Sequence, residues 1–185
     1  FPNVTLVGIL AADMSLYSND YRSGERTFEL LTQAAGRAGR GFLRGEVVIQ
    51  TYSPEHYSIR MAAEQDYEGF YAEEMRYRQL MGYPPASHLL AVLMTGTEEK
   101  HLELGAAYLK EFAARADRKK SMDIIGPASP YIGKVKDEYR RVIYLKCERK
   151  EELIRQKDLM EQYIEINTGF NSLRIQFDFN PMGIF

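Results

Sequence analysis

Short apolar runs alternate with amphipathic stretches through the first part of the chain. Residues 4–10 are a continuous aliphatic and β-branched run, a pattern typical of a strand buried on both faces of a parallel sheet, and residues 46–51 predict a second buried strand. Between them, apolar residues recur at helical spacing over 27–35, and glycines then predict the end of that helix. Ser53 followed by proline predicts a second helix with Ser53 as its N-cap. The order β-α-β-α predicts parallel strands covered by helices.

A third helix, rich in aromatic side chains, is predicted over 66–81. It ends at Gly82-Tyr83-Pro84-Pro85, because proline cannot continue a helix. We therefore predict three segments: a partial lobe over 1–66, a linking helix with its proline-rich boundary over 67–85, and a second domain over 86–185. Two strands and two helices do not complete a doubly wound sheet, so we expect its other strands upstream, in a longer protein.

The second domain shows a β-α-β-β-α-β pattern. Its predicted elements are a strand over 89–94, a helix over 98–115, a strand over 122–125, an irregular stretch over 126–137, a strand over 140–146, a helix over 150–166 and a strand over 172–179. This order is typical of a ferredoxin-like domain, a four-stranded antiparallel sheet with two helices on one face. The predicted fold class is thus a parallel α/β lobe followed by an α+β domain.

Composition narrows the classes of protein. Of 185 residues, 45% are hydrophobic and 27% charged, as in ordinary globular chains. The single Cys147 excludes a disulfide framework, and the three histidines lack ligand spacing, so we predict no metal site. The longest uncharged apolar run, residues 4–12, is far shorter than the ~20 residues of a membrane helix. No signal peptide is recognisable, so a cytoplasmic location is expected.

The formal net charge of −2 conceals a local excess of basic residues. Residues 115–150 hold 11 basic and 5 acidic side chains. Within that stretch, Lys134, Lys136, Arg140 and Arg141 surround a predicted turn, with Tyr131 and Tyr139 interleaved. Cations and aromatics together are typical of a DNA contact. A solvated loop is the alternative interpretation.

The segment from Gln33 to Arg40 carries the clearest candidate chemistry. Gln33, Arg37 and Arg40 are spaced as i, i+4 and i+7, with only alanine and glycine between them. Two neighbouring guanidinium groups are favourable opposite an anion such as a nucleoside triphosphate. A helix C-terminus, where arginines favour the helix dipole and glycine supplies the cap, explains the same residues. Spacing alone does not separate these interpretations.

This segment resembles motif VI of superfamily 2 helicases, Q-x-x-G-R-x-G-R. The longer string from Glu25 to Gly41 is similar to the primosomal protein N′ (PriA) family of bacterial replication-restart helicases. Further matching segments are Phe1-Pro2-Asn3-Val4, Ala12-Asp13, Ile49-Gln50-Thr51-Tyr52, Gly82-Tyr83-Pro84-Pro85, Gly126-Pro127-Ala128 and Tyr139-Arg140-Arg141. The resemblance therefore covers essentially the whole chain.

The resemblance implies an ATP-dependent 3′→5′ DNA helicase that assembles the primosome at stalled forks. In that family the first segment would be the end of the second RecA-like lobe. Arg37 and Arg40 would be catalytic and face the γ-phosphate. Gln33, Gly36 and Asp13 would bind ATP or couple its hydrolysis to movement.

The resemblance also implies ligands and partners. ATP and Mg²⁺ would act in the full-length protein, and zinc would bind only upstream of this chain. No phosphate loop or Walker B box occurs in the sequence, so the chain alone is expected to lack ATPase activity. Expected partners are forked and single-stranded DNA, primosome proteins and single-strand binding protein, at the bacterial nucleoid.

Two alternatives remain open. The aromatic residues of the third helix either stack on bases or pack in a core. The chain as a whole is either part of the helicase or a free-standing nucleic-acid-binding or protein-interaction module without ATPase activity. One such module would have the four-stranded sheet of RNA-recognition domains. The strand over 140–146 lacks the aromatic pattern of those domains, which disfavours this alternative.

Overall fold

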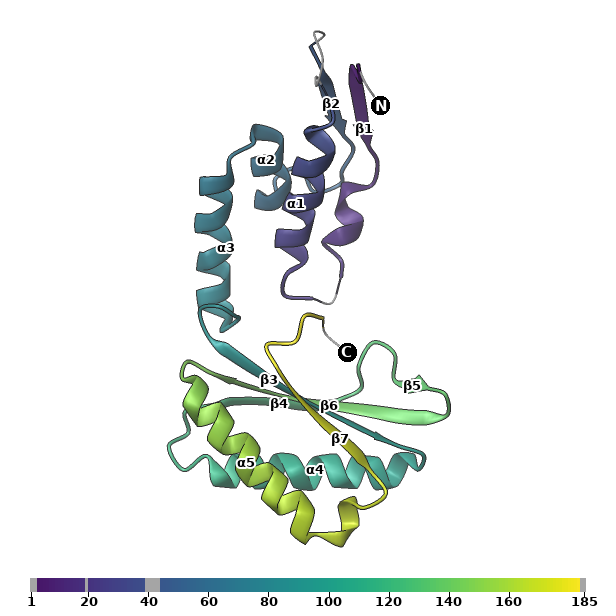
Figure 1. Ribbon diagram of the computed structural model, residues 1–185, viewed down its shortest axis with the longest axis vertical. Coiled ribbons are helices and arrows are strands. Elements are labelled where there is room, and N and C mark those ends of the chain that lie inside the picture. Colours follow the sequence, from purple (N-terminus) through teal and green to yellow (C-terminus); the bar gives the residue numbers. More distant parts are fainter. Residues whose placement is uncertain (1–2, 19, 39–43, 184–185) are drawn as a thin grey trace. The chain divides into compact units, whose positions relative to one another are not determined.

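The computed structural model describes residues 3–18, 20–38 and 44–183. The chain is a mixed α and β protein, as predicted, and divides into two compact units, 1–77 and 78–185 (Figure 1). The division falls within helix α3 (Tyr67–Met81), so one continuous helix contributes residues to both units.

The described residues of the first unit form two parallel strands, one 3-10 helix and three α-helices, the last of which continues into the second unit. Leu6 pairs with Glu46, and the register continues to Ile9 opposite Ile49. The elements are β1 (Leu6–Ile9), the 3-10 helix η1 (Ala12–Ser15), α1 (Ser23–Ala35), β2 (Glu46–Ile49), α2 (Tyr57–Glu64) and the first part of α3.

An aromatic core joins the helices of the first unit. The rings of Phe28 on α1 and Phe70 on α3 are stacked with centroids 4.1 Å apart, and Tyr57 on α2 stacks on Phe70 at 6.0 Å. Phe70 is buried, whereas Tyr67 and Tyr71 are exposed. Of the aromatics predicted in the third helix, Phe70 therefore packs in the core.

Two predictions for the first unit are wrong. The strands are not buried on both faces: exposure alternates along each, and Leu6 and Val48 are 61% and 53% exposed. In the described part of the chain, β1 and β2 pair only with each other, and Ile9 and Ile49 pack against the core that contains Phe28 of α1. Ser53 is not the N-cap of α2 either. His56 has that position, and its Nδ1 accepts a hydrogen bond from the Ser58 amide at 3.2 Å.

The second unit is an antiparallel sheet with two helices on one face (Figure 1). The strand order is β4-β6-β3-β7, and the short β5 pairs with β6. The elements are β3 (His88–Gly96), α4 (Glu99–Ala116), β4 (Asp123–Ala128), β5 (Lys134–Val135), β6 (Glu138–Cys147), α5 (Lys150–Ile166), the 3-10 helix η2 (Thr168–Phe170) and β7 (Arg174–Phe179).

Alternate residues of the central strand β3 and two helix faces form the core of this unit. Leu90, Val92 and Met94 of β3 pack with apolar side chains of α4 and α5 and are fully buried. One buried polar link joins the helices, because Gln156 Nε2 donates to the Ala113 carbonyl at 2.8 Å. This core fixes the sheet from which the β5–β6 hairpin extends.

The stretch predicted to be irregular, 126–137, contains regular structure. Strand β4 continues to Ala128, and β5 forms a hairpin with β6. The hairpin turns at Lys136 and Asp137, whose φ angles are +48° and +63°. A two-residue turn of this hand usually carries Asn-Gly, and Lys-Asp lacks that sequence signal.

Candidate functional site

The end of α1 presents the motif residues that lie within the described chain. The helix ends at Ala35 with Gly36 as its C-cap, and the Arg37 amide donates to the Ala34 carbonyl at 3.0 Å. Gln33, Gly36 and Arg37 are all exposed. The helix therefore ends where the glycines begin, as predicted, and Arg37 lies in the turn that follows Ala35. Arg40 lies outside the described residues.

Asp13, unlike these exposed residues, is buried, and both oxygens of its carboxylate accept hydrogen bonds. It accepts hydrogen bonds from Thr51 Oγ1 at 2.5 Å, from the Tyr52 amide at 2.8 Å and from the Ser53 amide at 3.1 Å. The bond from Thr51, followed by that from the Tyr52 amide, lowers the pKa of Asp13 below its ordinary value. The residue thus stays ionised and holds the turn after β2. The sequence around Asp13 gives no sign that its carboxylate pairs with Thr51.

A buried contact, not predicted from the sequence, positions the start of α1. The Tyr57 hydroxyl donates to Glu74 Oε2 at 2.7 Å, and Glu74 is only 5% exposed. Burial, and then the bond to Glu74, raise the pKa of Tyr57. Gly24 lies against this pair, since a Cβ at that position would be 2.7 Å from the Tyr57 oxygen. The close approach requires glycine there and fixes the helix that carries the motif residues.

The four cations predicted to contact DNA do not form one cluster. Arg140 and Arg141 are adjacent in β6 and therefore face opposite sides of the sheet. Arg141 Nη2 lies 2.9 Å from Glu99 and 2.6 Å from Glu103, both on α4, and its side chain is 13% exposed. These carboxylates already neutralise Arg141.

The other three cations lie in or beside the β5–β6 hairpin. Lys134 Nζ is 3.0 Å from Asp137 Oδ1 and 4.8 Å from the centroid of the Tyr139 ring. Lys136 is exposed at the turn. Arg140 is half-buried and donates from Nη1 to the Ile132 carbonyl at 3.2 Å. The basic surface is thus smaller than the sequence predicted.

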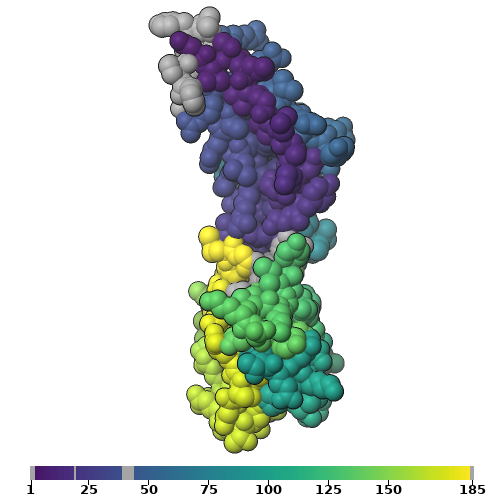
Figure 2. Space-filling view, turned by 90° about the vertical axis from the view of Figure 1, so that its right-hand side faces the viewer, coloured from purple at the N-terminus to yellow at the C-terminus, as the bar shows by residue number. Residues whose placement is uncertain are grey.

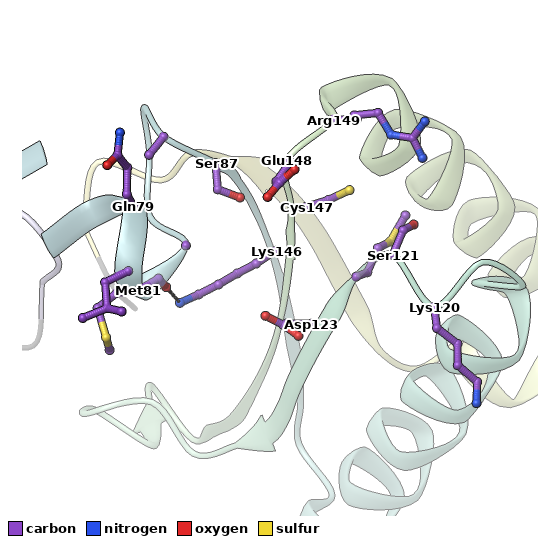
Figure 3. Close-up of a pocket in the computed structure, with 14 residues that line it drawn as sticks. Gln79, Met81, Ser87, Lys120, Ser121, Asp123, Lys146, Cys147, Glu148 and Arg149 are labelled. Atoms are coloured by element: carbon purple, nitrogen blue, oxygen red, sulfur yellow. Dashed lines mark hydrogen bonds between the residues drawn. The ribbon is translucent and has the colours of Figure 1, made fainter. Parts of the chain in front are cut away.

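A cavity of about 550 Å³ lies in the second unit, between the last turn of α3 and the adjacent ends of β4 and β6 (Figure 3). Lys146 crosses it, donates to the Met81 carbonyl at 2.8 Å and lies 3.7 Å from the Tyr83 ring centroid. Burial lowers the pKa of Lys146. Figure 3 shows Lys120 and Arg149 pointing away from Lys146. Lys146, the cation inside the cavity, therefore caps the carbonyl end of α3.

The described residues contain neither a candidate metal site nor a candidate membrane span. No group of three or more His, Cys, Asp or Glu side chains in these ranges is placed to hold a metal ion. None of the helices they form is both long and apolar enough to cross a bilayer.

The fold and these sites define a two-unit α and β protein with an exposed Arg37 at the end of α1 and a hairpin that carries Lys134, Lys136 and Arg140. The family model described as primosomal protein N C-terminal domain matches residues 79–182. The chain is also 40% identical, over 182 residues, to the replication restart protein PriA of Bacillus subtilis (strain 168), covering 98% of the chain. We conclude that the chain belongs to the PriA family.

Two further relatives have the same name as the Bacillus protein. The replication restart protein PriA of Thermotoga maritima is 38% identical over 153 residues, 83% of the chain, and that of Synechocystis sp. is 39% identical over 145 residues, 77% of the chain. The matches span 22%, 20% and 17% of the Bacillus, Thermotoga and Synechocystis proteins, about a fifth of their length. Among solved structures, the de novo designed protein Foldit4 matches 51% of this chain and 97% of its own, with 12% identity and a TM-score of 0.40, a likeness too low to carry an argument.

Proposed function

We propose that this chain is the C-terminal portion of an ATP-dependent DNA helicase of superfamily 2 that moves 3′→5′ and acts in replication restart. The observation that carries the proposal is the similarity to proteins named replication restart protein PriA, which runs through 98% of the chain and therefore spans both units.

In this proposal the first unit is the end of the second RecA-like lobe. Its parallel strands and the exposed Gln33 and Arg37 at the end of α1 are consistent with that role. ATP with Mg²⁺, held on another lobe, would supply the phosphoryl group that is transferred to water. Arg37 and Arg40 would stabilise negative charge on that group, with Gln33 and Gly36 beside them.

Asp13 would couple to this site indirectly. All three of its hydrogen bonds go to the turn at Thr51, Tyr52 and Ser53, which leaves the carboxylate buried. A buried carboxylate with these donors is suited to fixing a loop rather than to receiving a metal ion. We therefore propose that Asp13 positions the turn that follows β2, at the carboxyl ends of the strands, where ligands of parallel sheets bind.

The second unit would be a ferredoxin-like domain that binds DNA and partner proteins. The strand order β4-β6-β3-β7, with both helices on one face, supports this assignment. Lys136 and Arg140 would contribute phosphate contacts. The proposed partners are forked and single-stranded DNA, primosome proteins and single-strand binding protein, in the bacterial cytoplasm at the nucleoid.

The test is strand displacement by the full-length protein on duplexes that carry either a 3′ or a 5′ single-stranded tail. We expect ATP-dependent displacement on the 3′-tailed substrate only. The 185-residue chain alone should show no ATPase activity above background, with or without DNA. DNA binding without displacement or ATP turnover by the full-length protein would instead identify a binding module, and steady turnover by the isolated chain would contradict the motif assignment.

A further inference from the structure

The loop that precedes β5 exposes large apolar side chains beside the basic hairpin. Tyr131 is 86% exposed and Ile132 54%, and Val135 in β5 is 42% exposed. The segment around 125–140 (green) forms part of the surface of the second unit in Figure 2. Neighbouring exposed apolar residues on an otherwise polar surface are typical of an interaction site.

The backbone of this loop is held in place. The Arg140 amide donates to the Gly133 carbonyl at 2.9 Å, and its guanidinium donates to the Ile132 carbonyl. Gly133 lies tightly against the chain, because a Cβ there would be 2.6 Å from Ser129 Oγ. The exposed ring of Tyr131 therefore extends from a fixed backbone, which reduces the entropy lost when a ligand binds.

The charges of the hairpin and of the strands beside it favour an anionic partner. Both acids of the hairpin are already paired, Asp137 with Lys134 of the hairpin and Glu138 with Arg174 of β7. Arg140 and Arg174 both lie opposite Thr95 in the sheet register, one on each side of β3. Lys136 at the turn adds an exposed cation. An aromatic face flanked by cations is how proteins bind single-stranded nucleic acid without sequence preference.

We infer that Tyr131 stacks on an unpaired base of single-stranded DNA, while Lys136 and Arg140 contact its phosphates. The inference rests on the proposed DNA-binding function of the second unit and assigns the stacking residue within it. Tyr139, the other aromatic in this stretch, does not share the role. Its ring packs against the core and lies beneath Lys134. Arg140 has a second, positioning role through its bond to the Ile132 carbonyl.

The chain has no tryptophan, so one introduced residue can report on stacking. We would titrate the Tyr131→Trp chain with an oligothymidylate of about 20 nucleotides and follow its fluorescence. The matched control is Tyr108→Trp, at an exposed position on α4, which covers the other face of the sheet. We expect quenching for Tyr131→Trp and none for Tyr108→Trp. Equal quenching of both variants, or quenching of neither while DNA binds, would overturn the inference.

Affinity gives a second, independent measurement. Tyr131→Ala should weaken oligothymidylate binding by roughly five-fold or more, and Tyr131→Phe should bind within about two-fold of wild type, because the ring face provides the contact. Thermal unfolding should be unchanged in both variants, since the side chain is exposed. Wild-type affinity in Tyr131→Ala overturns the stacking role but leaves the proposed function intact. If the wild-type chain fails to bind the oligonucleotide at low salt, both the inference and the proposed DNA-binding role of this unit are wrong.

Discussion

The Thr51 hydroxyl donates a 2.5 Å hydrogen bond to the Asp13 carboxylate, across 38 positions of sequence. The amides of Tyr52 and Ser53 complete the set, so one ionised side chain joins the segment after β1 to the segment after β2. The sheet of the first unit has only two strands in the described chain. These hydrogen bonds therefore add a long-range connection between the ends of its two strands.

The first prediction is that Asp13 makes the first unit acid-sensitive. Its folded pKa lies below the ordinary value of 3.8, so the folded state binds fewer protons than the unfolded state in this range. The stabilisation is fully present above this ordinary pKa, which the unfolded chain has, and is lost as pH falls through the lower folded pKa. Urea midpoints of the first unit should therefore fall steeply below pH 4.

The matched variant is Asp13→Asn, which retains one oxygen acceptor but cannot be ionised. It should be less stable than wild type at pH 7, and its urea midpoint should depend less on pH between about 5 and 2. Circular dichroism and urea titration at several pH values measure both effects. Parallel pH profiles for the two proteins would show that other carboxylates cause the acid sensitivity.

The second prediction concerns Gly24. Helix propensity alone predicts that Gly24→Ala stabilises α1 by about 1 kcal/mol. The close approach of the Tyr57 oxygen predicts the opposite sign, a loss of about 1–3 kcal/mol from overpacking. Gly8→Ala is the control, because nothing lies within 4 Å of a Cβ at that position. Urea unfolding should show destabilisation for Gly24→Ala only, and a stabilised variant would contradict the packing described.

The third prediction separates Arg140 from Arg141. In salt titrations of single-stranded DNA binding, Arg140→Ala should reduce the slope of log K against log salt by about 0.7, one phosphate contact. Arg141→Ala should leave that slope unchanged, because Glu99 and Glu103 already pair with the side chain. It should instead lower the free energy of unfolding by about 0.5–1 kcal/mol. A reduced slope for Arg141→Ala would mean that its ion pairs break when DNA binds.

The fourth prediction tests the arginines in the full-length protein. Arg37→Ala and Arg40→Ala should each reduce ATP turnover by roughly 10³-fold, with nucleotide affinity nearly unchanged, because the contact strengthens in the transition state. Arg44→Ala, an exposed arginine beyond the motif, should turn over ATP normally. Near-normal turnover in both motif variants would leave the arginines with capping and surface roles only.

Elements with a clear pattern of apolar residues were predicted well from the sequence. The helix over 150–166 was predicted at both ends, and the fully buried strand β3 extends the predicted 89–94 by only one or two residues. The helix has one consistent apolar face and residues 89–94 of β3 are apolar throughout, so in both segments the local pattern and the tertiary environment agree.

The features that the local sequence pattern did not reveal share a physical cause, because each depends on a partner distant in sequence. Arg141 is neutralised by Glu99 and Glu103, which α4 brings across the sheet from about 40 residues away. The apolar run at 4–10 looked buried, but how many of its side chains are covered depends on which strands and helices lie beside it. Asp13 gave no local sign of its bond to Thr51.

The parallel pair β1–β2 also affects how the chain behaves in solution. Within the described residues each strand has one edge without a backbone partner, and apolar side chains such as Leu6 and Val48 are exposed beside it. Such edges are templates for intermolecular pairing. The sedimentation behaviour of the 185-residue chain should therefore depend on its concentration, and a truncated 78–185 chain should lack that dependence.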